Sequence, residues 1–271
     1  MGWPRRHFSL TERRPSREPE MSVPALDQQN DPEPRLRAEI AACTRLMNME
    51  GLMGYSGHVS ARLPDDRFLI QDFDQSRASL TPESLLICDM NGRLVSGPPG
   101  LRPVAEVHIH SEIYKARPDV NALAHFHHDL TTTFTLVEGA SLVPLKNHAL
   151  RWRSGIPVHP DPSHVDTPEL GRGLAASLGP HHACLIRAHG QVVVAEDVRS
   201  LLIDSIHLVE NAVALYQAAA LGKVIPLSER EMDDFARAFK RDKHVAKLWA
   251  YYIGRGREAG LLPAPWERWI G

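Results

Sequence analysis

Two histidines one residue apart mark a short apolar segment near the middle of the chain. The segment, residues 122–127, follows a Pro-Asp turn signal at 118–119 and is typical of a β-strand. On a strand, residues i and i+2 face the same side of the sheet, so His125 and His127 direct two imidazoles toward one point. Neutral imidazole binds zinc, manganese, iron and copper, so this pair predicts part of a metal site.

A third histidine and a carboxylate extend the predicted site. His189 ends another apolar run and is followed by Gly190, and Glu106 lies upstream of the histidine pair. Three nitrogen ligands and one carboxylate form a donor set for a single divalent ion. The predicted metal ligands are therefore His125, His127, His189 and Glu106.

The charge balance and the cysteine pattern argue against several classes of protein. The net charge is -2 over 271 residues, which does not favour nucleic acid or an acidic membrane surface as a partner. No apolar run approaches the roughly 20 residues of a membrane-spanning helix. Three cysteines, Cys43, Cys88 and Cys184, are far apart and typical of free thiols in a reducing compartment. We therefore expect a cytoplasmic protein with neither nucleic acid nor a membrane among its partners.

The first part of the chain differs in composition from the rest. Residues 1–33 are rich in Arg, Glu, Pro and Ser, and they carry too little apolar surface to order themselves. We expect a flexible N-terminal tail, with packing along a neighbouring subunit as the alternative. The arginine pair at 5–6 is not followed by an apolar segment, which argues against a secretion signal. Residues 34–271 are expected to form one catalytic domain.

Apolar spacing from residue 34 onward alternates between helical and strand periods. Turn signals at Asn91-Gly92 and His189-Gly190 join predicted strands into hairpins. These patterns predict one α/β domain with a mostly antiparallel sheet and helices on both faces. Helices are expected at 35–53, 103–116, 168–178, 198–221 and from 229 onward, and strands at 58–62, 67–71, 85–89, 93–96, 122–127, 183–188 and 191–195.

Two titratable residues of the helix predicted at 103–116 are candidates for proton transfer. Glu106 stands near the start of that helix and His110 follows four residues later, so the two side chains share a face and can form a hydrogen bond. The positive helix end and a bound metal would both keep the carboxylate ionised. We expect Glu106, or His110 working with it, to deliver a proton as the catalytic acid.

The chain resembles the class II aldolase and adducin family over residues 35–222. The resemblance implies a three-layer α/β/α sandwich and a homotetramer, or a multiple of one, with sites at subunit interfaces. In the family's sugar-phosphate aldolases the three matching histidines bind zinc, and the matching glutamate is the acid and base. The motifs that carry the resemblance are Glu106-x-x-x-His110-x-x-x-Tyr114-x-x-Arg117-Pro118-Asp119-Val120, His125-x-His127 and His189-Gly190.

The chain departs from those aldolases where they bind phosphate. They have a Gly-Asn pair, a Thr/Ser-Gly turn and two serines; this chain has Gly57-His58, Thr81-Pro82-Glu83 and Val104-Ala105 instead. Small hydroxyls and free backbone amides bind phosphate well, whereas proline has no amide to offer and glutamate repels the dianion. A sugar phosphate is therefore not the favoured substrate.

Aromatic and basic side chains are expected to line the site instead, which suits a flat, anionic ring. A second carboxylate on that ring needs an arginine, for which Arg151, Arg153 and Arg187 are candidates. The residues predicted to bind substrate are Tyr55, His58, Arg151 and Tyr251, with Phe126, His148, Trp152 and Tyr252 as further candidates.

The resemblance is strongest to the branch of the family that decarboxylates hydroxylated aromatic acids. It implies a metal-dependent carboxy-lyase that acts on a pyridine or benzene dicarboxylate. The favoured substrate is 3-hydroxy-2-methylpyridine-4,5-dicarboxylate of vitamin B6 degradation, losing its 4-carboxylate, and dihydroxyphthalates come second. Mn²⁺ is favoured, with Zn²⁺ or Fe²⁺ as alternatives. An aldolase or epimerase acting on a small sugar phosphate, and a non-catalytic adducin-like module, remain the other hypotheses.

Overall fold

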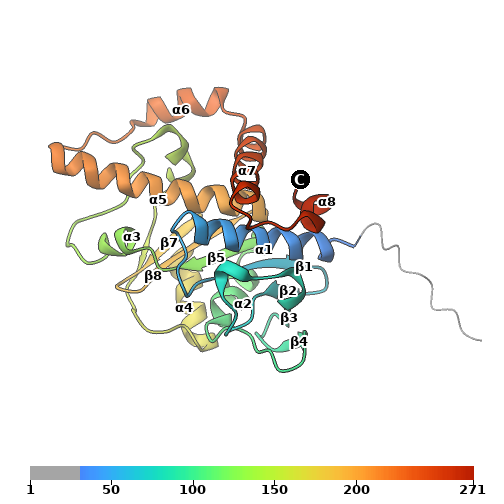
Figure 1. The fold of residues 1–271 in the computed structure, drawn as a ribbon. Coiled ribbons are helices and arrows are strands. Elements are labelled where there is room, and N and C mark those ends of the chain that lie inside the picture. The colour runs from blue at the N-terminus through green and yellow to red at the C-terminus, as the bar shows by residue number, and fades with distance from the viewer. Residues whose placement is uncertain (1–30) are drawn as a thin grey trace, which may run out of the picture. The chain divides into compact units, whose positions relative to one another are not determined.

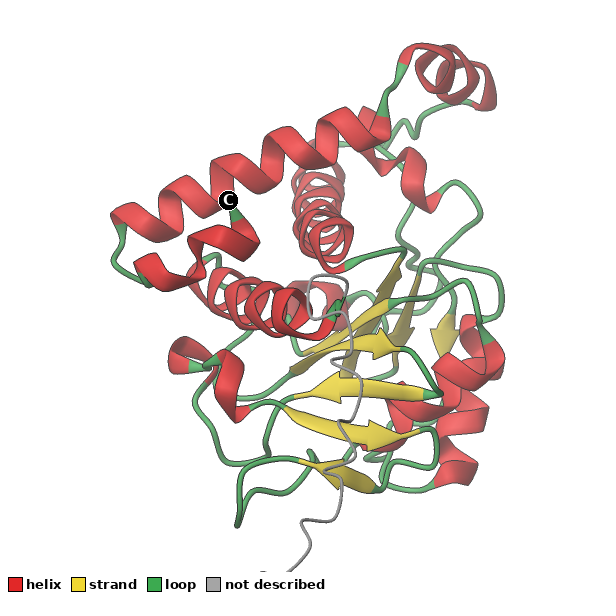
Figure 2. Cartoon of the chain, turned by 90° about the vertical axis from the view of Figure 1, so that its right-hand side faces the viewer, coloured by secondary structure: helices red, strands yellow, loops and turns green. Residues whose placement is uncertain are grey.

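One eight-stranded sheet runs through the molecule. The computed structural model describes residues 31–271, and Pro32–Gly271 form one compact unit. The predicted tail falls almost wholly outside the described residues. The strands lie in the order β4-β3-β2-β1-β5-β8-β7-β6. Neighbours pair antiparallel except β6 and β7, which pair in parallel. The expected mostly antiparallel sheet is confirmed (Figure 2).

The strands lie close to their predicted positions. One difference matters for the site: β5 ends at Phe126, so His127 lies just beyond the strand. The short β6 was not predicted, because two residues are too few to show a periodicity. The strands are β1 (His58–Leu63), β2 (Arg67–Ile70), β3 (Leu86–Asp89), β4 (Leu94–Ser96), β5 (Ala122–Phe126), β6 (Val158–His159), β7 (Ala183–Ile186) and β8 (Gly190–Ala195).

Helices cover both faces of the sheet, which confirms the three-layer arrangement (Figure 1). One face carries α1, α5, α7 and α8, and the other carries α2 and α4. The helix α7 was not predicted, although its buried Val245, Trp249, Tyr252 and Ile253 have helical spacing. The helices are α1 (Glu33–Met49), α2 (Val107–Ala116), α3 (Asp129–Thr133), α4 (Pro168–Leu178), α5 (Val198–Leu221), α6 (Glu229–Ala238), α7 (Arg241–Glu258) and α8 (Glu267–Ile270).

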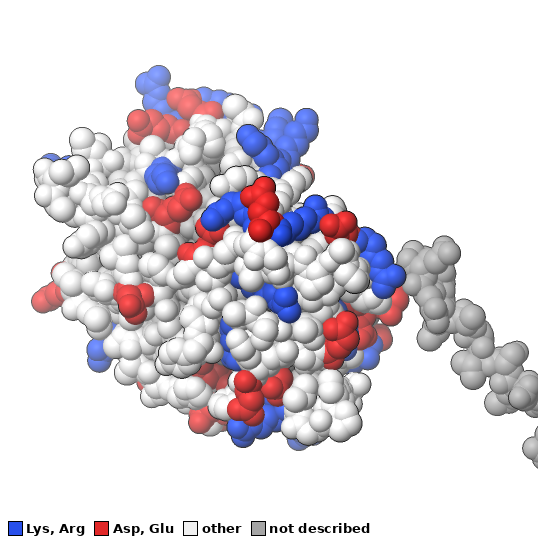
Figure 3. Space-filling view, in the orientation of Figure 1, with Lys and Arg blue, Asp and Glu red and all other residues white. Residues whose placement is uncertain are grey.

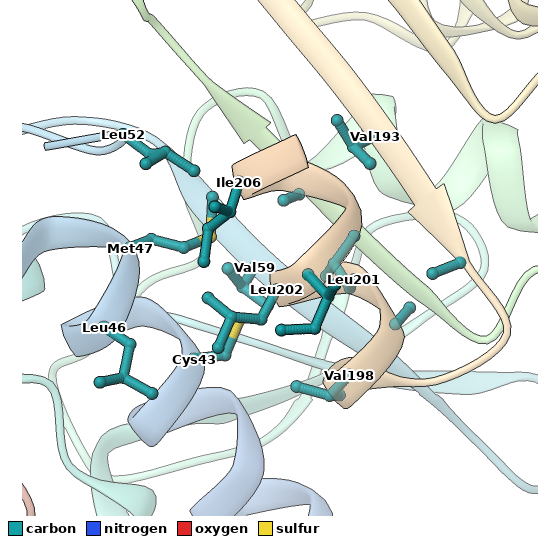
Figure 4. Close-up of a cluster of buried hydrophobic side chains, with 14 of the residues drawn as sticks. Cys43, Leu46, Met47, Leu52, Val59, Val193, Val198, Leu201, Leu202 and Ile206 are labelled. Atoms are coloured by element: carbon teal, nitrogen blue, oxygen red, sulfur yellow. The ribbon is translucent and has the colours of Figure 1, made fainter. Parts of the chain in front are cut away.

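Two apolar cores lie on the two faces of the sheet. Alternate residues of the central strand β5 enter different cores, with Ala124 on the α1/α5 side and Leu123 on the α2/α4 side. Since His125 shares the face of Leu123, its imidazole lies on the α2/α4 side. Figure 4 shows the α1/α5 core, where Cys43 of α1 and Leu202 of α5 lie beside Val59 of β1.

The start of α2 differs from the prediction. The helix begins at Val107, with Glu106 as its N-cap, instead of at residue 103. The backbone of Pro103 forms a bridge with Asp72, which holds the chain in an extended conformation just before the helix. Glu106 therefore caps the helix, and the predicted hydrogen bond with His110 is not formed, because His58 lies between them, 3.6 Å from Glu106 Oε2 and 2.6 Å from His110 Nε2.

Charged side chains of both signs are interspersed on the face drawn in Figure 3. None of the described helices is long and apolar enough to cross a membrane. All three cysteines are free thiols and buried, as expected. Burial raises the pKa of Cys88 and of Cys184 to about 12, so these two thiols stay protonated and act as small apolar side chains.

Candidate metal centre

Four side chains from separate parts of the chain converge where β5 ends. We call His125, His127, His189 and Glu106 the candidate metal centre, because one ligand atom of each lies within 4.8 Å of the others. The Nε2 atoms of His125 and His127 are 3.0 Å apart. Glu106 Oε2 lies 3.3 Å from His125 Nε2, and its Oε1 lies 3.5 Å from His189 Nε2. The structure thus brings together all four residues predicted as metal ligands.

Hydrogen bonds behind the rings fix which nitrogen faces the centre. His125 Nδ1 lies 3.0 Å from the Gln191 carbonyl oxygen, which can only accept, so Nδ1 carries the proton and Nε2 presents a lone pair. Ser56 Oγ, 2.9 Å from His127 Nδ1, can accept the proton of that ring in the same way. Two lone pairs directed at one point repel each other unless a cation lies between them. The donor set therefore fits a divalent metal ion.

The turn between β7 and β8 brings His189 to the centre. Ala188 has a φ of 54°, a left-handed conformation that costs a residue with a Cβ about 1 kcal/mol. Its backbone N–H donates to Thr135 Oγ1 at 3.0 Å, which helps to hold the turn. A Cβ on Gly190 would lie 2.6 Å from the Phe126 carbonyl oxygen, so only glycine lets the turn pack against β5.

The protonation states suit metal binding. Burial lowers the pKa of His125 to about 4 and that of His127 to about 3, so both rings are neutral near pH 7. Burial would raise the pKa of Glu106, but its contacts with the imidazoles of His125 and His58 outweigh burial and hold that pKa below the usual range. Neutral imidazoles beside an ionised carboxylate are the forms that bind a cation.

A cavity of about 430 Å³ opens beside the candidate metal centre. Its lining includes Glu106, His127 and His189, and Tyr55 and Phe73 form aromatic parts of its wall. A second hollow is lined by three of the same histidines, His127, His164 and His189, and also by Tyr55. A flat molecule in the cavity would therefore contact both the ligand set and an aromatic surface.

The predicted substrate-binding residues divide into two groups. Tyr55 and His58 line the cavity. Arg151 does not, because its guanidinium is paired with Glu196 at 2.6 Å and Asp204 at 2.9 Å. Tyr251 lies on α7 against Tyr252, and it is not part of the cavity lining within this chain. The prediction for Arg151 and Tyr251 is therefore not met in a single chain.

The other expected arginines are also elsewhere. Arg153 pairs with Glu229 and Asp233 on α6. Arg187 is exposed and lies outside the cavity lining. The sequence did not show that Arg151 and Arg153 are paired with acidic side chains, because those partners are distant along the chain.

The arginine that does line the cavity is Arg77, which the sequence did not single out. It is 7% exposed, and no carboxylate of residues 31–271 forms a salt bridge with it. Its Nε donates to the Gly57 carbonyl at 2.8 Å, and its Nη1 donates to the carbonyls of Phe73 and Gln75 at 3.3 and 2.5 Å. Backbone carbonyls thus fix a guanidinium at the cavity wall, and the carboxylates of Asp72 and Asp74 act on its charge without forming a salt bridge.

His164 is a second lining residue that was not predicted. Its Nε2 lies 3.7 Å from Glu106 Oε2, and the neighbouring Val165 N–H donates to Glu106 Oε1 at 3.0 Å. Both contacts come from the loop before α4. No sequence pattern marks this loop, since its position depends on the packing of α4 against α2.

Another histidine group is formed by α5 and the short 3-10 helix Asn147–Trp152. We call His148, His207 and Glu210 the second cluster, whose ligand atoms also lie within 4.8 Å of one another. The two imidazoles stack with centroids 4.0 Å apart and planes 18° from parallel, and His148 Nε2 lies 3.6 Å from Glu210 Oε2. Lys146 Nζ lies 3.3 Å from Glu210 Oε2 and already supplies a cation. The second cluster therefore fits a metal ion poorly.

Comparisons with known proteins agree with this geometry. The chain matches the family described as "Class II Aldolase and Adducin N-terminal domain" over residues 38–216. It is 27% identical over 234 residues to a 3,4-dihydroxyphthalate decarboxylase of Rhodococcus jostii, covering 81% of this chain and 95% of that protein. It is 28% identical over 164 residues to a methylthioribulose-1-phosphate dehydratase of Methylococcus capsulatus, covering 56% of this chain and 79% of that protein.

A solved structure shows the same architecture. An aldolase II superfamily protein from Pseudomonas syringae superposes with a TM-score of 0.73 at 25% identity, over 85% of this chain and 95% of that one. The family match spans well over half of the chain and contains all four residues of the candidate metal centre. The chain belongs to the class II aldolase and adducin family.

Proposed function

We propose that this protein is a divalent-metal-dependent decarboxylase of a hydroxylated aromatic dicarboxylate. The observation that carries the proposal is the position of Arg77, a buried guanidinium that forms no salt bridge with a carboxylate of residues 31–271, on the same cavity as the candidate metal centre. A decarboxylase in the family, 27% identical over nearly its whole length, acts by its name on such a ring diacid. Mn²⁺ is the proposed metal, and a homo-oligomer is the proposed assembly.

A ring with a carboxylate and a neighbouring hydroxyl has two oxygens for a cation and, in a diacid, a further carboxylate for an arginine. When bound, the metal ion would stabilise negative charge on the ring oxygen as CO₂ departs. Arg77 would bind the carboxylate that stays, because a guanidinium matches carboxylate geometry. Tyr55 and Phe73 would contact the ring faces.

Glu106 would move the proton. As an ionised carboxylate it takes the proton of the ring hydroxyl and delivers it to the ring carbon that carries the departing carboxylate. The bond between that carbon and the carboxylate then breaks, CO₂ leaves, and the electron pair returns to the ring and its oxygen. The product oxyanion takes a proton from water, so the reaction consumes one proton for each CO₂ released.

The test is CO₂ release from a panel of acids by protein loaded anaerobically with Mn²⁺ or Zn²⁺. The panel includes 3-hydroxy-2-methylpyridine-4,5-dicarboxylate, 3,4-dihydroxyphthalate and their monocarboxylate analogues. We expect turnover of a diacid and weak turnover of the monoacids, with the preference lost in Arg77→Met. No release from any diacid would reject the proposal.

A sugar phosphate is the second candidate substrate, supported by the likeness to a methylthioribulose-1-phosphate dehydratase. The cavity wall beside Glu106 is formed by Val104 and Ala105, which have no hydroxyl to offer a phosphate. Turnover of fuculose-1-phosphate or ribulose-5-phosphate, without turnover of ring acids, would favour this candidate over the decarboxylase.

A further inference from the structure

A line of buried polar side chains runs from the cavity into the α2/α4 side of the sheet, and every contact after the first is a hydrogen bond. His58 Nε2 lies 3.6 Å from Glu106 Oε2, and His58 Nδ1 lies 2.6 Å from His110 Nε2. His110 Nδ1 is 2.5 Å from Ser60 Oγ, which is in turn 2.7 Å from the hydroxyl of Tyr114. Glu106 and His58 line the cavity, and the other three side chains lie behind them. Glu106 is thus connected to Tyr114 through three polar side chains.

The secondary structure explains why these groups meet. His58 and Ser60 are two residues apart on β1 and face the same side of the sheet. His110 and Tyr114 are four residues apart on α2 and share the helix face that covers β1. His58 also stands directly opposite the metal-centre residue His125 in the β1–β5 register. This line of side chains therefore connects β1 with α2 beside the candidate metal centre.

The donors and acceptors available determine which group donates in each hydrogen bond of the line. If Tyr114 donates to Ser60, Ser60 to His110 Nδ1 and His110 Nε2 to His58 Nδ1, then His58 carries its proton on Nε2, facing the Glu106 carboxylate. Every donor then has an acceptor. The reverse direction would leave the Tyr114 proton without an acceptor among the described residues and would place a lone pair of His58 against a carboxylate.

Water cannot satisfy a hydrogen that has no acceptor in this line, because the side chains are buried. Ser60 and His110 are 0% exposed and Tyr114 is 1% exposed, so a misdirected hydrogen would remain unsatisfied inside the protein. With one proton on each ring, His58 and His110 can each donate one hydrogen bond and accept one. A line of neutral groups with one fixed acceptor at its end has one fully satisfied arrangement.

We propose that His58 is a catalytic residue that presents a fixed Nε2–H to an anionic substrate oxygen beside Glu106. His110, Ser60 and Tyr114 are positioning residues that hold His58 in this tautomer. The substrate part of the inference rests on the proposed function, since a ring carboxylate or ring oxyanion supplies the acceptor. The tautomer itself depends only on this chain.

The first experiment reads the tautomer without substrate. Zinc-loaded protein with ¹⁵N-labelled histidine is studied by NMR, and the His58 and His110 signals are assigned by their loss in His58→Gln and His110→Gln. We expect both rings to be protonated at Nε2 and unprotonated at Nδ1. Protonation of His58 at Nδ1, or at both nitrogens, would overturn the inference whatever reaction the protein catalyses.

The second experiment separates positioning from packing. His110→Phe keeps the ring volume but removes the donor to His58, whereas His110→Gln keeps an N–H near the position of Nε2. We expect kcat to fall about 10-fold in His110→Phe with KM nearly unchanged, and His110→Gln to recover most of that loss. Equal kcat values in the two variants would reduce His110 to a packing residue and contradict the positioning role.

Two controls keep the outcome interpretable. His159 is also buried and hydrogen-bonded, to Ser177 Oγ at 2.8 Å, but it lies on β6 outside this line, so His159→Gln should leave kcat unchanged. Bound zinc and circular dichroism report whether each variant is folded. If wild-type protein releases no CO₂ from any diacid while the NMR result holds, the proposed function fails and the tautomer assignment stands.

Discussion

The candidate metal centre and the second cluster hold the same kinds of side chain and differ in how they are oriented. Both contain histidines and one glutamate whose ligand atoms lie within 4.8 Å of one another. In the candidate centre a backbone carbonyl behind His125 turns a lone pair inward, and a glycine turn presses His189 toward β5. In the second cluster Lys146 faces the glutamate, and His148 Nε2 has no hydrogen-bond partner among the described residues. Composition alone therefore does not make a metal site; the groups behind the ligands do.

The largest expected difference between the candidate metal centre and the second cluster is in their contribution to metal binding. His127→Ala removes one of three nitrogen ligands, so the protein should lose bound metal and at least about 100-fold in activity. His207→Ala, the matched change in the second cluster, should leave both unchanged. Elemental analysis after dialysis, together with CO₂ release, measures the effect. Metal retained in His127→Ala but lost in His207→Ala would reverse the assignment.

The two glutamates should differ in their effect on rate. Glu106→Gln keeps an oxygen near the metal but cannot transfer a proton, so it should retain metal and slow the chemical step by about 100-fold or more. Glu210→Gln removes the charged partner of Lys146 and His148, away from the cavity, and should leave the rate unchanged. Full activity in Glu106→Gln, measured in single-turnover experiments, would exclude a proton-transfer role for Glu106.

Two glycine substitutions test whether the backbone conformation at the turn positions His189. In Gly190→Ala the new Cβ meets the Phe126 carbonyl oxygen at 2.6 Å, so the His189 turn must shift and metal affinity should fall about 10-fold. In Gly173→Ala, inside α4, the nearest atom lies 3.6 Å away, and the helix should gain up to about 1 kcal/mol. Competition with a chelator measures affinity. Unchanged affinity in Gly190→Ala would mean that the turn does not position His189.

The same distinction explains what the sequence could predict. The metal ligands could be predicted because His125 and His127 are two residues apart in an apolar strand segment. Glu106 could be predicted because it begins the motif Glu106-x-x-x-His110. The sheet and the α5 helix were readable from apolar spacing. Arg77 was not, because its role depends on carbonyls of a loop that folds back over the start of β1. Nor was the His58–His110 contact, which requires the packing of α2 on β1.

The smallest expected difference lies in the pH dependence of the metal-free protein. Burial lowers the pKa of His127 and of His207 alike to about 3, whereas an unfolded chain titrates its histidines near pH 6.5. Between these values the unfolded chain binds more protons than the folded one, so each ring should reduce stability as the pH falls below about 6.5. Without metal, both clusters therefore contribute to acid destabilisation in the same direction.

Metal should separate the two contributions. Saturating Zn²⁺ binds the folded chain and should raise the urea midpoint at about pH 7 and, by a smaller amount, at about pH 5, because protons compete for the same nitrogens. This gain should disappear in His127→Ala and persist in His207→Ala. A gain that survives in His127→Ala would place the stabilising ion outside the candidate metal centre, and the orientation of ligands would then not be what distinguishes the two clusters.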